Sequence, residues 1–84
     1  MNYQEQITKL QGLQKDVNLL TRIAQTTTLD THAERALFLG LESAIDKTLD
    51  AMDKTVRNMY ACGAMNGYVL MEWETIIEGL RQQN

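Results

Sequence analysis

Residues 62–67, Cys-Gly-Ala-Met-Asn-Gly, lie between two stretches that have the spacing of helices. Gly63 readily takes the left-handed backbone conformation found just past a helix end, and Asn66-Gly67 is a dipeptide typical of turns. We therefore expect one helix to end near residue 62 and another to begin near residue 68, with the chain reversing its direction between them.

The segment after this turn predicts an amphipathic helix over about residues 68–82. Its apolar residues recur at intervals of three and four, which keeps one face of a helix against a neighbour. These residues are Val69, Leu70, Trp73, Ile76, Ile77 and Leu80. Because Trp73 stands in the middle of the stripe, we expect its ring to be buried in the core, with stacking on a ligand as the alternative.

Two longer helices are predicted before the turn, over about residues 2–25 and 31–62. The chain contains no proline, and both segments are rich in residues that enter helices at little cost. The apolar positions are Tyr3, Ile7, Leu10, Leu13, Val17, Leu20 and Ala24 in the first helix and Leu37, Leu41, Ile45, Thr48, Met52, Val56 and Met59 in the second. Gly12 interrupts the first pattern, and we attribute it to a close helix crossing.

The segment between these two helices carries a stop signal and a start signal. Three β-branched threonines at residues 26–28 disfavour helix. Thr31 and Glu34 have the spacing of a capping box, in which each side chain bonds the backbone N–H of the other residue. The sequence thus predicts an all-α fold of one domain, residues 1–84. It is a long antiparallel helical hairpin with a third, shorter C-terminal helix, similar to a three-helix bundle.

The second predicted helix carries apolar residues on more than one side. On a helical wheel Phe38 and Leu39 point away from the core positions, and Leu49 shares a second stripe with Phe38. The third helix, about 21 Å long, covers only the C-terminal half of a second helix of about 45 Å. We therefore expect Phe38, Leu39 and Leu49 to bind another chain. Leu19 and Ile23, which leave the main face of the first helix, extend this surface.

The sequence leaves open an alternative, in which a bent first helix or a drifting three-helix interface buries these five residues within the chain. A chain this short buries only about 60–65% of the surface that it exposes when unfolded, so its stability as a monomer is small. We accordingly expect a homo-oligomer or a complex with a protein partner.

Charge and composition disfavour other classes of partner. The chain has 8 basic and 11 acidic residues, a net charge of -3, and the scattered basic residues disfavour binding to nucleic-acid phosphates. The longest apolar run, residues 36–41, is too short to span a bilayer. Because one cysteine cannot close an internal disulfide and the N-terminus lacks a secretory signal, we expect a cytoplasmic protein.

No residues stand in a catalytic or metal-binding pattern. His32, the only histidine, has no second ligand at metal spacing, and we expect it to be solvated in the first turn of its helix. Cys62 has no neighbouring cation or imidazole to activate it, so we expect a small buried residue. Since the sequence also lacks phosphate loops and nucleophile motifs, we expect neither an enzyme nor a bound cofactor or metal.

Two functional hypotheses follow. The first is a small cytoplasmic interaction protein, of the adaptor, inhibitor or chaperone type, that acts by helix-on-helix binding. Secretion chaperones, phage and plasmid regulators and anti-factor proteins share this helical-hairpin format. The second is an oligomer that binds or sequesters a small ligand between helices, in a pocket lined by Trp73, Tyr60 and methionines.

Overall fold

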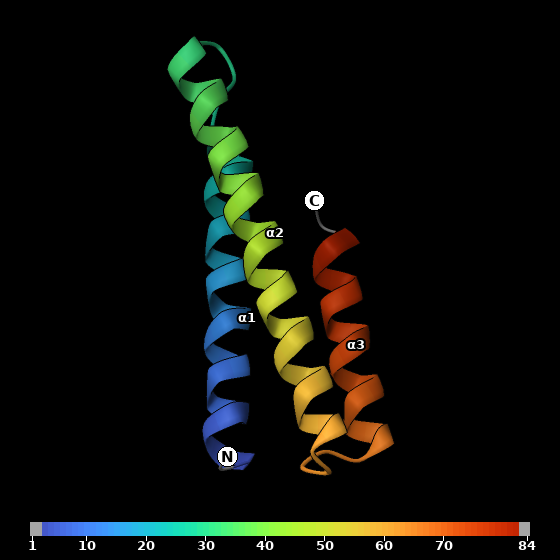
Figure 1. The fold of residues 1–84 in the computed structure, drawn as a ribbon. Coiled ribbons are helices and arrows are strands. Elements are labelled where there is room, and N and C mark those ends of the chain that lie inside the picture. The colour runs from blue at the N-terminus through green and yellow to red at the C-terminus, as the bar shows by residue number, and fades with distance from the viewer. Residues whose placement is uncertain (1–2, 83–84) are drawn as a thin grey trace.

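Three α-helices make up all the regular secondary structure of residues 3–82, the part of the chain that this computed structural model describes. They are α1 (Tyr3–Thr26), α2 (His32–Ala61) and α3 (Gly67–Gln82). α1 and α2 form a long antiparallel hairpin, and α3 returns alongside the half of α2 nearest the second turn (Figure 1). The predicted all-α fold is confirmed. Predicted and observed helix ends differ by at most one residue, apart from the predicted start at residue 2, which lies outside the described range.

The seam between α1 and α2 follows an alternating spacing of three and four residues, which is the spacing of helices that pack along their length. Its positions are Tyr3, Ile7, Leu10, Gln14, Val17, Thr21 and Ala24 on α1 and Phe38, Leu41, Ile45, Thr48, Met52, Thr55 and Met59 on α2. Leu10, Val17, Ile45 and Met52 are almost completely buried. The seam therefore holds the two helices together along most of α1.

The start of α2 differs from the prediction in one respect. Leu37, expected to face α1, is exposed, and Phe38 is half-buried against the core instead. At about 100° per residue, Phe38 lies about 20° from the direction of Ile45, whereas Leu37 lies about 80° from it. The predicted core position of Leu37 was wrong because Leu37 stands eight residues before Ile45 and so faces away from the seam. Phe38 stands seven residues before Ile45, which is about two helical turns, and so faces the seam.

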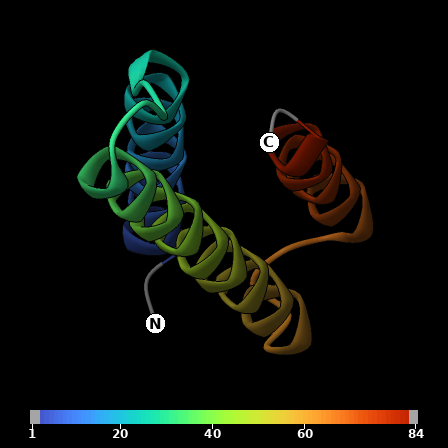
Figure 2. The same cartoon turned by 90° about the horizontal axis from the view of Figure 1, so that it is seen from above.

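α2 packs against both other helices, whereas α1 and α3 form no comparable interface with each other. Seen along the long axis, α1 and α3 stand apart, and α2 is the helix that both contact (Figure 2). One core cluster nevertheless includes residues of all three helices, among them Leu10, Leu49 and Trp73. The bundle-like arrangement is thus an open one, assembled on two sides of α2.

The second turn ends α2 with a Schellman motif. Gly63 has a φ of 77°, and its N–H donates to the carbonyl of Tyr60 at 3.1 Å. The N–H of Ala64 donates to the carbonyl of Met59 at 2.9 Å. The predicted left-handed conformation of Gly63 is confirmed, and the buried Met65 anchors the turn to the core.

Asn66 is the N-cap of α3, which corrects the predicted Asn66-Gly67 turn. Its side-chain carbonyl accepts a hydrogen bond from the N–H of Val69 at 2.9 Å, and its backbone carbonyl accepts one from the N–H of Leu70 at 3.0 Å. Gly67 is already helical and lacks a positive φ. The residues of this dipeptide therefore start the helix, because the short Asn66 side chain satisfies a first-turn amide.

The first turn is closed by two contacts from the start of α2. Thr31 Oγ1 accepts a hydrogen bond from the N–H of Glu34 at 3.1 Å, and Nε of Arg35 donates to the carbonyl of Leu29 at 2.9 Å. Of the two hydrogen bonds of the predicted capping box, only the one that Thr31 Oγ1 accepts forms among the described residues. An N-cap and an arginine therefore fix the direction in which the chain enters α2.

Two features of α1 weaken the hairpin. The buried hydroxyl of Thr21 has no hydrogen-bond partner among the described residues, whereas Thr48 of α2 donates to the carbonyl of Ala44 at 2.7 Å. A buried unpaired hydroxyl costs about 1–3 kcal/mol. Gly12 costs about 1 kcal/mol relative to alanine. No atom lies within 4 Å of the place a Cβ of Gly12 would take, so the close helix crossing expected there is absent.

Trp73→Ala is expected to lower the free energy of unfolding by about 3–5 kcal/mol, because it empties a core position. Trp73 is 9% exposed and belongs to the core cluster. Tyr68→Ala is the matched control, since Tyr68 on the same helix is 83% exposed, and it is expected to change stability by no more than about 0.5 kcal/mol. Urea denaturation at one protein concentration measures both, and equal losses would remove Trp73 from the core.

Gly63→Ala is expected to lower the free energy of unfolding by about 1–2 kcal/mol, because a Cβ is disfavoured in the left-handed conformation of Gly63. Gly67→Ala serves as the control, since Gly67 has no positive φ and space is open around it. It is expected to leave stability unchanged or to raise it. Thermal unfolding of the two variants tests this, and the reverse order would contradict the Schellman turn.

Candidate functional site

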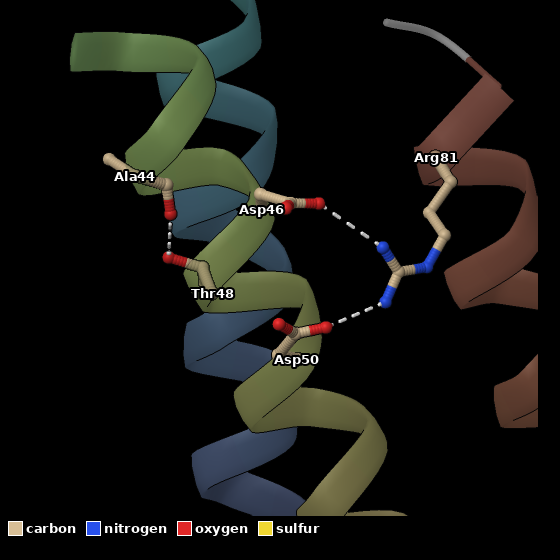
Figure 3. A network of polar contacts seen from close by, with 5 residues as sticks. All are labelled: Ala44, Asp46, Thr48, Asp50 and Arg81. Carbon is tan, nitrogen blue, oxygen red and sulfur yellow. Dashed lines mark hydrogen bonds and ion pairs between the residues drawn. The ribbon is translucent and has the colours of Figure 1, made fainter.

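α3 ends before it has covered all of α2. Close to its C-terminal end, Arg81 donates to the carboxylates of Asp46 at 3.3 Å and Asp50 at 3.0 Å (Figure 3). These ion pairs are largely exposed, and such pairs contribute less than about 1 kcal/mol each. They mark the level on α2 at which α3 stops. We define the hairpin tip as residues 17–45, which comprise the end of α1, the first turn and the start of α2.

Large apolar side chains are exposed at the hairpin tip on both helices and in the first turn. They are Leu19, Ile23, Leu29, Leu37 and Leu39. Outside the tip, Tyr68 and Met71 of α3 are exposed as well. The sequence analysis missed these two, although a helical wheel places both on the charged side of α3.

Leu49 is not part of this surface. It is 1% exposed and lies in the core cluster with Trp73 and Leu80 of α3, so its predicted role in partner binding was wrong. The physical reason is length: Leu49 lies about 18 Å from the end of α2, within the roughly 24 Å that α3 spans. α3 therefore reaches the level of Leu49 but not that of Leu39.

Phe38 lies at the border between core and surface. It is half-buried and packs against the core cluster, since it occupies a position of the α1–α2 seam. A charge at Phe38 would therefore disturb the hairpin itself. Leu39, one residue further along, is 64% exposed and free of that role.

The exposed residues at the predicted sites do not form one continuous patch. Leu39 turns about 120° from the direction of Ile45, toward the side of α2 that carries Asp46 and faces α3. Leu19 turns about 200° from Val17, which places it on the back of α1. The structure therefore places these two leucines on different sides of the hairpin tip. Ile23 follows Leu19 by one helical turn and is exposed beside it.

A second apolar surface lies on the side of the hairpin away from α3, and the sequence analysis did not anticipate it. In Figure 3, Asp46 and Asp50 point toward Arg81. At about 100° per residue, Ala44 turns about 200° from Asp46 and so faces the other side of α2. Leu13 of α1 lies on the same side as Ala44. Each of these residues is offset from the seam of its own helix by a rotation in the same sense. In two antiparallel helices, residues offset in the same sense lie on the same side of the hairpin.

We define the lateral face as this side of the hairpin. Its α1 side carries Leu13, Leu20 and Ile23 with the charged Lys9 and Asp16 beside them, and its α2 side carries Gly40, Ala44 and Ala51. Leu13 and Leu20 are half-buried and Ile23 is exposed. The opposite flank of α1 is polar and carries Gln11, Asn18 and Gln25. An uncovered flank that combines apolar and charged side chains thus lies opposite the side of α2 that α3 occupies.

Three surface hollows can be compared with the predicted ligand pocket, and of the residue types expected there only a methionine, Met71, lines one of them. One is lined by Leu39, Glu42, Ser43 and Asp46 beyond the end of α3. Two others involve the outer side of α3 and the charged border between α2 and α3. Trp73 is buried and Tyr60 is exposed, and neither lines any of these three hollows.

The side chains with chemical reactivity stand apart from one another. His32 is exposed at the start of α2. Cys62 is also exposed, so the expectation that it is buried was wrong, because it caps α2 at the edge of the second turn. Among residues 3–82 no group of histidine, cysteine or carboxylate side chains could hold a metal ion, and no helix could span a membrane.

The molecule exposes more surface than its mass requires. Its accessible surface is 5751 Å² for 9.6 kDa, about 650 Å² more than a compact monomer of this mass exposes. The radius of gyration is 14.8 Å, against about 12 Å for a compact chain of this length. The excess reflects the open arrangement around α2.

Comparison with known proteins gives no indication of function. No family model, curated protein or solved structure matches this chain. The function must therefore be inferred from the exposed surfaces of the hairpin.

Leu49→Ala is expected to lower the free energy of unfolding by about 2–5 kcal/mol, because it opens a cavity in the core. Leu39→Ala, the same change on the same helix, is expected to cost no more than about 0.5 kcal/mol, because Leu39 lies at the surface. Urea denaturation of both variants makes the comparison. A large loss for Leu39→Ala would place that residue in the core and remove it from the candidate surface.

Proposed function

We propose that this protein is a small helical interaction module, which binds another protein chain through its hairpin tip. The observation that carries the proposal is the exposure of five large apolar side chains on a tip that α3 leaves uncovered. Exposed apolar side chains mark an interaction surface where they are neighbours, as Leu19 and Ile23 are on α1. The partner's binding energy would come from burial of apolar area against these side chains.

The geometry of the tip favours an extended apolar helix or groove as the partner surface. Leu39 lies beside the hollow that Glu42, Ser43 and Asp46 also line, so this apolar anchor has a polar and acidic rim. Leu19 and Ile23, on α1, offer a pair of apolar side chains one turn apart. Helix-on-helix recognition uses anchors at this spacing.

The proposed mechanism is occupancy alone, without a catalytic step. An adaptor, inhibitor or chaperone needs only to cover or present a surface, and rigid helices lower the entropy lost on binding. The chain's exposed reactive side chains, His32 and Cys62, lie at separate ends of α2, which argues against a shared catalytic centre.

Leu39→Asp and Leu19→Asp are expected to release the proteins that the wild-type chain retains from a lysate of its own organism. Each change places a charge in a contact that excludes water. Met71→Asp is the control, because Met71 is exposed to a similar degree on α3, away from the tip. Affinity capture with quantitative mass spectrometry measures the retained proteins, and circular dichroism checks that all baits stay helical.

The expected result is a set of proteins retained by the wild type and by Met71→Asp but lost from both tip variants. Equal retention by all four baits contradicts the proposal, as does a wild type that retains no protein and does not self-associate. If only the Met71→Asp bait lost the retained proteins, the binding surface would lie on α3 and not on the tip.

A further inference from the structure

We infer that the lateral face is a homodimer interface, in which α1 of one copy packs on α2 of the other about a two-fold axis parallel to the hairpin. The inference rests on the proposed function in one respect, since both assume that the chain acts by helix-on-helix binding. It commits to the lateral face, which shares Ile23 with the apolar surface of the tip, and to a second copy of this chain as the occupant.

The first argument is the difference between the two flanks of the α1–α2 seam. On the flank facing α3, α1 carries Gln11, Asn18 and Gln25, which water can solvate. On the other flank it carries Leu13 and Leu20, which remain only half-buried, beside the exposed Lys9 and Asp16. A helix that is apolar beyond its seam is covered on that side by another element, and α3 lies on the opposite side of α2.

The second argument is the match between large and small residues at equal heights. The start of α1 and the end of α2 lie at the same end of the molecule (Figure 1), so positions on the two helices can be counted from that end. With Tyr3 of α1 set level with Ala61 of α2, this count puts Leu13 at the level of Ala51 and Leu20 at that of Ala44. Ile23 comes within one residue of the level of Gly40.

A two-fold rotation about the hairpin axis turns this match into a packing arrangement. It places α1 of one copy over α2 of the other at unchanged height, so each large side chain of α1 meets a small residue of the partner's α2. Small residues let helix axes approach, and facing ridges and grooves then interdigitate. The contact is self-complementary, as a two-fold interface must be.

Charge on the lateral face fits the same arrangement. Asp16 lies within one residue of the level of Lys47, both are exposed, and neither forms an ion pair within residues 3–82. In the dimer Asp16 of each copy lies beside Lys47 of the other. Lys9 and Lys54 also share a level, but this like-charge pair is exposed near the end of the face, where solvent and salt screen it.

The surface area is consistent with a dimer of this kind. The open molecule exposes about 650 Å² more than a compact monomer, and a standard interface buries roughly 800 Å² of each partner. All contacts between neighbouring helices in the resulting four-helix arrangement are antiparallel. Antiparallel neighbours also bring opposite helix dipoles together.

Gly40→Glu tests the interface without disturbing the hairpin. No atom lies within 4 Å of the place a Cβ of Gly40 would take, so the monomer has room for the side chain. The dimer would bury two unpaired carboxylates, and its dissociation constant is expected to rise by at least about tenfold. Sedimentation velocity over a range of protein concentrations measures the dissociation constant.

Gly79→Glu is the matched control, because Gly79 is a helical glycine with equally open surroundings on the outer side of α3. It changes the net charge by the same amount and is expected to leave the dissociation constant within about twofold of the wild type. A wild type that stays monomeric at every concentration overturns the inference. So does a Gly40→Glu variant that dimerises like the wild type.

Charge exchange between Asp16 and Lys47 tests the pairing of α1 with α2 directly. Asp16→Lys and Lys47→Asp each place like charges in both contacts of a homodimer, so each variant alone should dimerise more weakly than the wild type. A one-to-one mixture of the two variants restores opposite charges in both contacts. We expect it to form a heterodimer, and a mixture in which neither variant gains affinity for the other overturns this arrangement.

The outcomes separate the dimer from the proposed function. A monomeric wild type whose retained proteins are released by Leu39→Asp and Leu19→Asp overturns the dimer and leaves the function of the tip intact. A dimer that Gly40→Glu dissociates, together with equal retention by the tip variants, supports the dimer and contradicts binding by the tip.

Discussion

The structure depends on the burial of one long helix on two sides. α2 is the only helix that packs against both others, and its buried residues include Ile45 on the seam with α1 and Leu49 in the cluster with Trp73 of α3. α2 has 30 residues and α3 has 16. Because the covering helix is shorter, a part of α2 must remain uncovered in the isolated chain, and that part forms the hairpin tip.

The sequence was sufficient to predict the helices, because their signals are local. Gly63 and Thr31 mark helix ends through the conformation and hydrogen bonding of a few neighbouring residues. The absence of proline and the apolar spacing of three and four residues predicted the helices between these ends. Asn66 was misread as part of a turn because a short polar residue serves equally well in a turn and as an N-cap.

The candidate surfaces were harder to predict, because exposure depends on where other helices end. Leu49 and Leu39 have the same chemistry, and the reach of α3 together with the direction each faces separates the buried residue from the exposed one. Leu13 and Leu20 were assigned to the core, since a hydrophobic stripe does not show which of its edges stays uncovered. The weak contact between α1 and α3 decides this, and it is a property of the three-dimensional arrangement.

The lack of packing between α1 and α3 also has a consequence for local opening. α3 is attached to the molecule by one turn and one interface, whereas α1 and α2 share a long seam. A segment with a single interface can detach as a cooperative unit while the remainder stays folded. Backbone amides of α3 should therefore exchange with solvent deuterium at a lower opening free energy than those in the middle of α2. Any ligand or chain that bridges α1 and α3 would slow that exchange.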